Sequence, residues 1–362
     1  MKILTIVGAR PQFIKAAMVS LAVAKRGGAV TEEILHTGQH YDPVMSEIFF
    51  EQMKIPQPSV MLECGGMSHG AMTGKMLTEI EKEIVQRKPD WVLVYGDTNS
   101  TLAGALAAAK LHVPVAHVEA GLRSYNKRMP EELNRILTDH VASLLLCPTS
   151  VAVENLASEG IVEGVHQVGD VMYDAALLFG KTADQESSIL ESLFLHSGNY
   201  MLATVHRAEN TDDPMRLASI FQAFAQLASQ ECPVVLPLHP RTAACLAKLR
   251  VMDKLTTNQY VRCIEPVSFL EMVTLEKNAR LVLTDSGGIQ KEAYFHGVPC
   301  VTLREETEWV ETIEAGWNQL AGADTASIVN ACRQAKKGSQ IDEYGTGNAA
   351  KKIIKLLEEC GT

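Results

Sequence analysis

The feature of this sequence that most constrains its fold is a regular alternation of short apolar runs with helix-forming segments. In the first half, the apolar runs predict strands at residues 2–7, 33–37, 91–95, 113–118, 144–147 and 165–168. A second series predicts strands at residues 201–205, 234–238, 261–264, 281–284 and 300–303. Helices are predicted between the strands, for example at residues 72–87, 102–110 and 131–144. This alternation is typical of parallel sheets covered by helices, so the predicted fold class is α/β with two Rossmann-like doubly wound domains.

The boundary between the two series lies in residues 182–197, which are polar and partly helical and carry no strand pattern. A chain of 362 residues is also longer than one hydrophobic core usually serves. We therefore expect a first domain at 1–180, a second at 181–345, and a C-terminal segment at 346–362 with an amphipathic helix. Ligands of such domains bind at the carboxyl ends of the strands, here in a cleft across which the two domains face each other.

Composition narrows the function classes. The net charge of −10 argues against nucleic acid or an anionic membrane as the main partner. The 8 cysteines form no C-x-x-C pair, which favours reduced thiols over disulfides or a zinc site. No secretory signal or membrane-spanning apolar run is present, so we expect a cytoplasmic protein. Neither metal-ligand spacing nor a G-x-G-x-x-G fingerprint occurs, and we expect no metal and no dinucleotide cofactor.

A candidate phosphate site follows the predicted strand at 281–284. Ser286, Gly287 and Gly288 lead into a helix, where backbone N–H groups and the helix dipole favour an anion such as a diphosphate. Glu292 lies about one turn further on and could accept hydrogen bonds from the hydroxyls of a ribose. A serine-capped helix after a buried strand would explain the same residues equally well.

Charged residues also follow strands in the first half. Arg10 and Lys15 place two cations at the start of the helix after the first strand. Asp97 ends the third predicted strand, where it is either a functional carboxylate or the cap of the next helix. Glu119 leaves an apolar strand directly into a glycine turn, a position that packing does not require. For Glu132, near the start of the next helix, the ordinary preference of acids for a first helical turn is a sufficient explanation.

In the second half, His206 and Arg207 end one strand, and His239 with Arg241 repeats the arrangement on the next. A histidine beside an arginine at a strand end is a better anion ligand than an isolated histidine. The chain therefore offers carboxylates from one half, with histidine, arginine and helix N–H donors from the other. This combination suggests proton transfer on a phosphorylated or nucleotide-linked substrate.

Five motifs in order carry a resemblance to a known family. They are Gly8-Ala9-Arg10-Pro11, Gly96-Asp97-Thr98, His117-Val118-Glu119-Ala120-Gly121-Leu122-Arg123, Pro130-Glu131-Glu132-Leu133-Asn134-Arg135 and Thr284-Asp285-Ser286-Gly287-Gly288-Ile289-Gln290. The chain resembles the non-hydrolysing UDP-N-acetylglucosamine 2-epimerases over essentially its whole length. The resemblance implies the two-domain glycosyltransferase-B fold, a catalytic cleft between the domains, a homodimer, and a C-terminal helix that crosses back to the first domain.

The resemblance also implies an isomerase that needs no cofactor. The family eliminates UDP from a UDP-amino-sugar to give a 2-acetamidoglycal, then adds UDP back after protonation on the other face. The resemblance implies that Asp97, Glu119 and Glu131 are the acid/base and charge-stabilising carboxylates, but it does not decide which one removes the C2 proton. It also implies that His206 lies near the diphosphate. The expected substrate-binding residues are Arg10, Lys15, Arg123, Arg135, Arg207, His239, Met272, Ser286, Gly287, Gly288 and Glu292.

The sequence departs from the family pattern at several positions. Gln12-Phe13 replaces Glu-Ala after the first strand, and Trp309-Val310 replaces Arg-Pro in a Thr-Glu-Arg-Pro-Glu run. Met272 stands where an aromatic side chain often packs on uracil. Tyr41 replaces an arginine in a loop that, in some members, helps to bind an activating UDP-sugar.

These variants resemble a branch that acts on UDP-2,3-diacetamido-2,3-dideoxyglucuronate for bacterial surface polysaccharide, and we favour that substrate over UDP-GlcNAc. Phe13 and Trp309 could contact the additional acetyl group or could simply be packing substitutions. Three other functions remain open: a UDP-sugar-dependent glycosyltransferase of the same fold, a hydrolysing 2-epimerase, and a non-catalytic UDP-sugar sensor.

Overall fold

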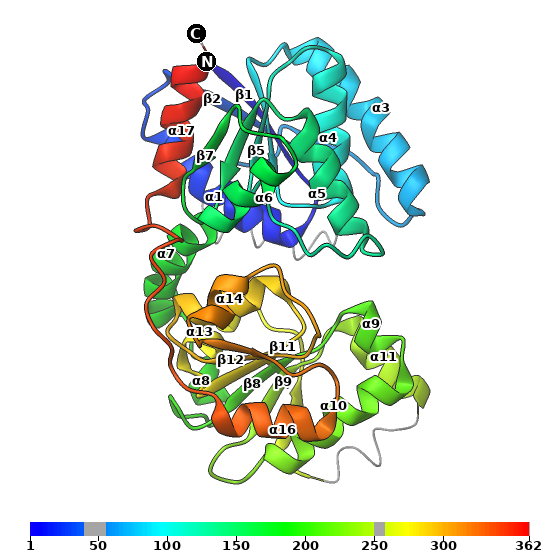
Figure 1. Cartoon of the computed structure of the whole chain (residues 1–362), viewed down its shortest axis with the longest axis vertical. Coiled ribbons are helices and arrows are strands. Elements are labelled where there is room, and N and C mark those ends of the chain that lie inside the picture. The colour runs from blue at the N-terminus through cyan, green and yellow to red at the C-terminus, as the bar shows by residue number, and fades with distance from the viewer. Residues whose placement is uncertain (40–55, 250–257, 362) are drawn as a thin grey trace. The chain divides into compact units, whose positions relative to one another are not determined.

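The structure, a computed structural model, describes residues 1–39, 56–249 and 258–361, and Figure 1 shows the whole chain. Tyr41 lies outside the described residues, and so does the side chain of Arg10. The chain forms two compact units, one of Met1–Ala175 with Asp342–Thr362 and one of Ala176–Ile341.

The first unit is built on a parallel sheet of 7 strands in the order β3-β2-β1-β4-β5-β6-β7. The strands are β1 (Lys2–Val7), β2 (Thr31–His36), β3 (Val60–Met61), β4 (Trp91–Tyr95), β5 (Val115–Val118), β6 (Leu144–Cys147) and β7 (Val165–Gln167). The strand order reverses between β1 and β4. In doubly wound sheets, ligands bind at the carboxyl ends of the strands beside this reversal.

The second unit repeats the design with 6 parallel strands in the order β10-β9-β8-β11-β12-β13. The strands are β8 (Met201–Thr204), β9 (Val234–Pro237), β10 (Val261–Ile264), β11 (Leu281–Thr284), β12 (Cys300–Thr302) and β13 (Asn318–Leu320). Here the order reverses between β8 and β11. The predicted fold class, α/β with two Rossmann-like doubly wound sheets, is therefore confirmed.

Helices connect the strands of both sheets. The first unit contains α1 (Arg10–Ala24), α3 (His69–Arg87), α4 (Asn99–Lys110), α5 (Pro130–Val141), α6 (Ser150–Ser158) and α17 (Ala349–Cys360). The second contains α8 (Ile189–Ser192), α9 (Ala208–Thr211), α10 (Pro214–Leu227), α11 (Pro240–Leu249), α13 (Phe269–Asn278), α14 (Gly287–Phe295), α15 (Val310–Glu314) and α16 (Thr325–Gln334). The chain passes from the first unit to the second within α7 (Val171–Glu186).

Central strands such as β4 are apolar along their whole length because helices cover both faces of a parallel sheet. Every residue of β4, for example, is buried. Each predicted strand is present, with ends shifted by at most two residues. Two further strands, β3 and β13, were not predicted, because they are edge strands of two and three residues and are too short for a hydrophobic pattern.

The last helix, α17, returns to the first unit. The carboxylate of Asp174 accepts hydrogen bonds from the backbone N–H groups of Ala349 (3.1 Å) and Ala350 (2.9 Å), which have no acceptor within the helix. The helix packs against α1 (Figure 1). Burial raises the pKa of Asp174 above its ordinary value, against the lowering effect of these two N–H donors.

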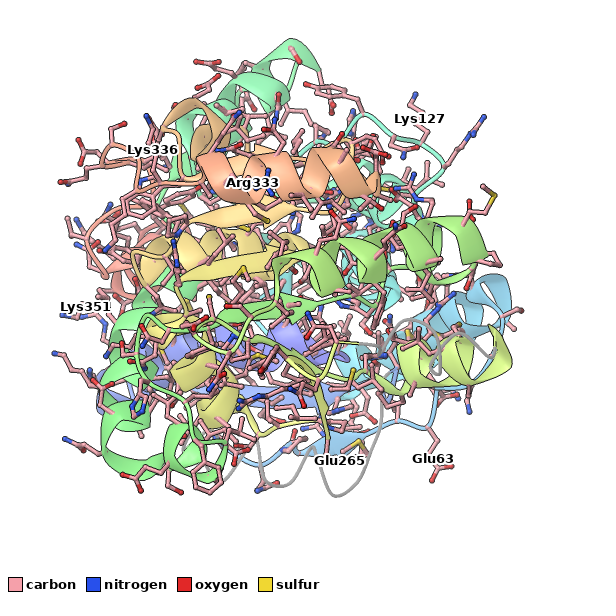
Figure 2. The ribbon with its side chains drawn as sticks, turned by 90° about the horizontal axis from the view of Figure 1, so that it is seen from below. Glu63, Lys127, Glu265, Arg333, Lys336 and Lys351 are labelled. Carbon is pink, nitrogen blue, oxygen red and sulfur yellow. The ribbon has the colours of Figure 1, made fainter. Side chains whose placement is uncertain are left out.

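Charged side chains such as Lys127, Lys336 and Lys351 extend outward from the helices and loops (Figure 2). Among the described residues, no helix has both the length and the apolar character needed to cross a membrane.

Helix α5 is amphipathic, but its polar face is buried and its apolar face is exposed. Its buried residues are all polar or charged: Glu132, Asn134, Arg135, Thr138 and Asp139. Leu133 and Leu137, four residues apart on one face, remain 45% and 51% exposed. A helix of a single-chain protein normally turns its leucines toward the core, so another requirement must orient α5.

Candidate active site

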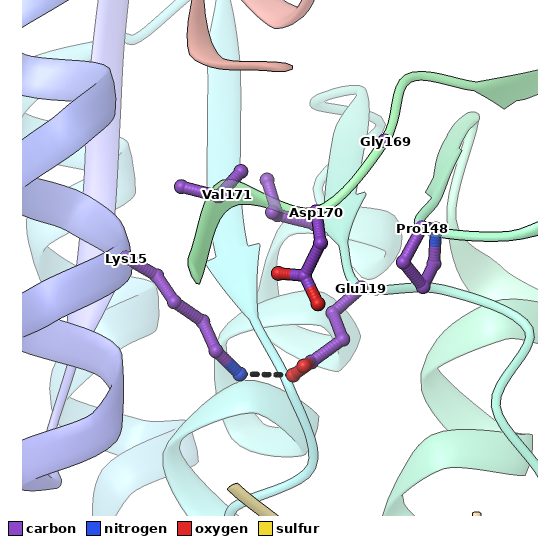
Figure 3. Close-up of a pocket in the computed structure, with 7 residues that line it drawn as sticks. Lys15, Glu119, Pro148, Gly169, Asp170 and Val171 are labelled. Carbon is purple, nitrogen blue, oxygen red and sulfur yellow. Dashed lines mark hydrogen bonds and ion pairs between the residues drawn. The ribbon is translucent and has the colours of Figure 1, made fainter. Parts of the chain in front are cut away.

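The carboxyl end of the first sheet brings Glu119 and Lys15 together. The ammonium group of Lys15, on α1, is ion-paired with the carboxylate of Glu119, which follows β5 (Figure 3). Only 10% and 12% of these side chains are exposed. Glu119 has a φ of +74°, a left-handed conformation that is strained for a residue with a side chain. Such strain persists where the surroundings enforce it and is concentrated at functional sites.

Gly96, directly after β4, lies against this ion pair. Its φ is +63°, and a Cβ atom there would approach Glu119 Oε2 to 3.2 Å and Lys15 Nζ to 3.3 Å. Glycine is therefore required at this position both by the backbone conformation and by the closeness of the pair.

Asp97, the next residue, accepts a hydrogen bond from Arg135 Nη1 at 3.0 Å and keeps 34% of its side chain exposed. Burial raises the pKa of the Asp97 carboxyl above its ordinary value. Arg135 and Lys15 oppose this shift, whereas Glu119 and Glu131 add to it. A carboxyl group whose pKa is raised while it remains accessible is suited to proton transfer.

Two further carboxylates, Glu131 and Glu132, lie at the start of α5. Glu131 lies in the first helical turn and is partly exposed. Glu132 is fully buried and accepts hydrogen bonds from Arg135 Nε (3.1 Å) and from the backbone of Tyr125 (2.8 Å). Glu132 therefore anchors Arg135, in agreement with the structural explanation considered for it from the sequence.

Gln12 fixes the turn between β1 and α1. Its side-chain oxygen accepts from the N–H groups of Gly8 (2.8 Å) and Ala9 (3.0 Å). Its amide group donates to the carbonyl of Tyr95 (2.8 Å) and the hydroxyl of Thr101 (3.0 Å). A glutamate could not donate these last two bonds. Gln12, where the family has glutamate, therefore links the end of β1 to the end of β4 by hydrogen bonds. Neighbouring Phe13 is buried.

Asp170 is a site residue that the sequence analysis missed. A small pocket is lined by Lys15, Val118, Glu119, Pro148, Gly169, Asp170 and Val171. Figure 3 shows the Asp170 carboxylate directed toward the Lys15–Glu119 pair. One of its oxygens also accepts from the N–H of Met172 at 2.7 Å. Its position after β7 at the same edge of the sheet was the available signal.

Arg123, expected to bind substrate, is held inside the first unit. Its guanidinium donates to both carboxylate oxygens of Glu159 (2.7 and 2.8 Å), to Asp139 (2.7 Å) and to the carbonyl of Leu122 (2.7 Å). The side chain is 1% exposed. These contacts favour a structural role for Arg123 over direct contact with substrate.

In the second unit, α14 begins at Gly287 directly after β11 and Ser286. The first N–H groups of a helix have no acceptor within it and attract anions. The Ser286 side chain does not cap the helix. A Cβ atom at Gly288 would lie 3.7 Å from Glu292 Oε1 and 3.9 Å from Ser286 Oγ, so these three residues surround one exposed point. The arrangement fits a diphosphate with a hydroxyl-bearing group beside it.

His206 lies after β8, the strand that pairs with β11. Its Nδ1 is 3.5 Å from Oδ1 of the fully buried Asp285, and its ring centroid is 5.6 Å from that of His239. Burial lowers the pKa of His206, Arg207 and His239 add to the lowering, and Asp285 opposes it. A neutral imidazole at neutral pH can both donate and accept a proton.

Asp285 also builds the turn that carries His206. Its carboxylate accepts from the backbone N–H groups of His206 (3.1 Å) and Arg207 (3.0 Å) and from the side chain of Asn210 (3.1 Å). The sequence predicted no role for Asp285, because hydrogen bonds between distant strand ends leave no sequence pattern.

The other predicted residues of the second unit lie at or near the same edge. Arg207 is partly buried, and His239 is exposed after β9. Met272, on α13, packs partly buried against an apolar cluster that includes Leu275 and Ile289. Trp309 is buried, and its ring lies 3.8 Å from the Nζ of the buried Lys291, a cation–π contact. Trp309 and Phe13 thus both occupy interior positions.

Two doubly wound units, with carboxylates at the switch point of one and a helix N-terminus at that of the other, fit the class of two-domain enzymes that use nucleotide sugars. Residues 22–358 match the family described as UDP-N-acetylglucosamine 2-epimerase. The chain belongs to this family, as its motifs predicted, and has the family's glycosyltransferase-B fold.

Individual relatives align over their whole length. The chain is 53% identical to the UDP-2,3-diacetamido-2,3-dideoxy-D-glucuronate 2-epimerase of Pseudomonas aeruginosa, with 99% of both proteins covered. The Methanocaldococcus jannaschii UDP-GlcNAc 2-epimerase, solved in complex with UDP-GlcNAc and UDP, superimposes with a TM-score of 0.92 at 42% identity, covering 99% of this chain and 100% of that one. The Neisseria meningitidis UDP-GlcNAc 2-epimerase bound to UDP-GlcNAc gives a TM-score of 0.91 at 31% identity, with coverages of 99% and 100%.

Proposed function

We propose that this chain is a non-hydrolysing UDP-N-acetyl-amino-sugar 2-epimerase, an isomerase acting on carbohydrates. The observation that carries the proposal is the Lys15–Glu119 pair beside Asp97 at the switch point of the first sheet. Several carboxylates of differing environment gather there. One unit thus supplies acid/base groups, while the other offers donors for a diphosphate that is first leaving group and then nucleophile.

The proposed reaction has two halves. A carboxylate accepts the C2 proton while the C1–O bond to UDP breaks, which forms a C1=C2 double bond and a 2-acetamidoglycal. A proton then returns to the opposite face of C2, and a UDP oxygen attacks C1. Asp97, Glu119 and Glu131 divide these roles as a coupled set. No redox cofactor is needed, because elimination of UDP and its re-addition involve no net oxidation or reduction.

For the nucleotide, we assign Ser286, Gly287 and Gly288 to the diphosphate and Glu292 to the ribose, with His206, Arg207 and His239 beside them and Met272 toward the base. We assign Arg10 and Lys15 to the substrate contacts of the first unit, and Arg135 positions Asp97. The domains at 1–180 and 181–345 thus have separate roles.

We propose the diacetamido glucuronate as the preferred sugar. The 53% identity to an enzyme named for that substrate supports this choice. The additional carboxylate needs a cation, and Arg123 and Arg135 are both held by internal carboxylates. Arg207, which follows β8 and is partly exposed, is therefore the better candidate to bind the additional carboxylate of the sugar. Phe13 and Trp309 are buried and would act on the acetyl pocket only through neighbouring residues.

The experiment is incubation with each UDP-sugar in deuterated water, followed by NMR at C1 and C2. We expect the manno epimer with deuterium at C2, and a higher kcat/KM for the diacetamido uronate than for UDP-GlcNAc. Full retention of hydrogen at C2 would refute the elimination mechanism, and free sugar in the products would indicate a hydrolysing enzyme. A need for an acceptor, with unchanged C2, would indicate a glycosyltransferase, and binding without turnover a sensor.

We further propose that the enzyme is a homodimer formed through the outer face of α5, where Leu133 and Leu137 are exposed. A second copy would bury apolar surface that a monomer leaves in water. Light scattering should give the mass of a dimer, and Leu137→Glu should reduce it to that of a monomer. The matched control Val162→Glu changes another exposed apolar residue and should remain dimeric.

The 8 free thiols support action in the cytoplasm, where thiols stay reduced.

A further inference from the structure

His117 is a fully buried histidine whose two ring nitrogens both face oxygen acceptors. It lies in β5, with Nδ1 2.7 Å from Asp139 Oδ1 and Nε2 2.7 Å from the carbonyl oxygen of Gly96. A neutral imidazole carries a proton on only one nitrogen and can donate one of these bonds. Both bonds form together only when His117 is an imidazolium, and each is then charge-assisted.

The surroundings balance this buried charge. Asp139 Oδ2 accepts from Arg123 Nη1 (2.7 Å), and Arg123 in turn holds both oxygens of Glu159. The chain of His117, Asp139, Arg123 and Glu159 therefore alternates two cations with two anions. Burial opposes ionisation of Asp139, but His117 and Arg123 together hold its pKa below the ordinary value. A buried charge of this kind is tolerated only with such partners.

The same two residues join two turns of the candidate active site. His117 holds the carbonyl of Gly96, the residue before Asp97. Asp139 Oδ2 also accepts from the backbone N–H of Gly121 at 3.1 Å, two residues after Glu119. Gly96, Glu119 and Gly121 all have positive φ angles, of +63°, +74° and +81°. Backbones in this region need surrounding contacts to stay there, and the His117–Asp139 pair supplies contacts to both turns.

We propose that His117, as an imidazolium paired with Asp139, is a positioning residue that sets the separation of the carboxylates of Asp97 and Glu119. This inference rests on the proposed catalytic roles of Asp97 and Glu119. His117 touches no reacting atom, so its loss should change the rate of the chemical step and leave binding of the nucleotide in the second unit intact.

The test is His117→Asn, whose amide can occupy the place of Nδ1 and donate to Asp139 but does not reach the Gly96 carbonyl. We expect kcat to fall about 10-fold or more, since small misplacements of catalytic groups are costly, with KM within about threefold and unchanged affinity for UDP. Asp139→Asn should show the same split between kcat and KM. The control His166→Asn, on β7 and two strands away from β5, should behave as the wild type. An unchanged kcat in folded His117→Asn, with only a lower melting temperature, would overturn the proposal.

A second measurement holds even if the variants fail to fold. Nitrogen-15 NMR of the wild-type protein at neutral pH should show both ring nitrogens of His117 protonated, and one bare nitrogen would overturn the proposal. The measurements distinguish a failure of the proposed function from a failure of the proposed role of His117. Absence of epimerase turnover in the wild type refutes the proposed function, whereas the ratio of variant to wild type and the nitrogen spectrum test the role of His117.

Discussion

The ammonium of Lys15 is paired with the carboxylate of Glu119, and Glu119 holds that position in a left-handed backbone conformation. An ion pair made only for stability would not require a strained partner. The strain turns the Glu119 side chain across the end of β5 toward α1, where Gly96 leaves it room. The relationship therefore identifies the end of β5 as the centre of the candidate site.

The three carboxylates can be tested by isosteric amides. Asp97→Asn, Glu119→Gln and Glu131→Gln should each lower kcat by roughly 10²-fold or more, the usual scale for a positioned acid or base. The affinity for UDP, measured by calorimetry, should change far less because the proposed phosphate donors belong to the second unit. Glu163→Gln, an exposed acid in the same unit, is the matched control. Near-wild-type turnover in any one of the three would remove that residue from the mechanism.

Gly96→Ala tests the closeness of the Lys15–Glu119 pair. The new methyl group would press on both side chains at 3.2–3.3 Å, and the positive φ would add about 1 kcal/mol of strain. We expect kcat to fall about 10-fold or more.

Gly160→Ala provides the control for Gly96→Ala. Gly160 has a φ of +83°, but a Cβ atom there meets nothing within 4 Å. This variant should lose a similar amount of stability and keep its kcat. Equal kcat values for the two variants would show that the site tolerates displacement of the pair.

The proposed phosphate cradle can be tested with UDP alone. His206→Ala or Ser286→Ala should weaken binding by about 1.5–3 kcal/mol, one to two decades of affinity, through loss of a charge-assisted hydrogen bond. His196→Ala, in an exposed turn of the same unit, should bind UDP normally. Unchanged calorimetric affinity in both cradle variants would place the diphosphate elsewhere.

The raised pKa of Asp97 makes stability depend on pH in a predictable direction. Between the ordinary pKa of an aspartate, about 4, and the higher folded-state value, the folded protein binds more protons than the unfolded one. Stability therefore falls as pH rises through this window and stays lower above it. Asp97→Asn removes this cost, so its melting temperature should exceed that of the wild type at pH 7. The difference should shrink below pH about 4, and a less stable variant at neutral pH would contradict the assignment.

The sequence predicted the sheet strands well because buried parallel strands are continuous apolar runs with clear ends. It missed β3 and β13, which have only two and three residues and pair on one side only. The sequence also predicted that Glu119 and Ser286 follow strand ends, and the structure places them there, because a charge or glycine stands out after an apolar run. The family motifs then assigned roles that spacing alone left open.

What the sequence did not predict are the internal partners of the site. Arg123 looked like a substrate ligand because its motif places it near Glu119, but Asp139 and Glu159, which hold it, are 16 and 36 residues away. His117 was overlooked for the same reason, whereas the position of Asp170 after β7 was a signal that could have identified it. Hydrogen bonds across a sheet join residues that no local pattern connects.

Helix α5 has a consequence for redesign of the protein. A procedure that orients helices by hydrophobic pattern would turn α5 by about half a revolution and bring Leu133 and Leu137 inward. Arg135 and Asp139 would then point to solvent, and the turns beside Asp97 and Glu119 would lose the groups that hold them. Variants chosen only for core packing would gain apolar contacts but lose the contacts that hold the candidate active site. The twelve residues of α5 should therefore be kept fixed in any stabilised version of this enzyme.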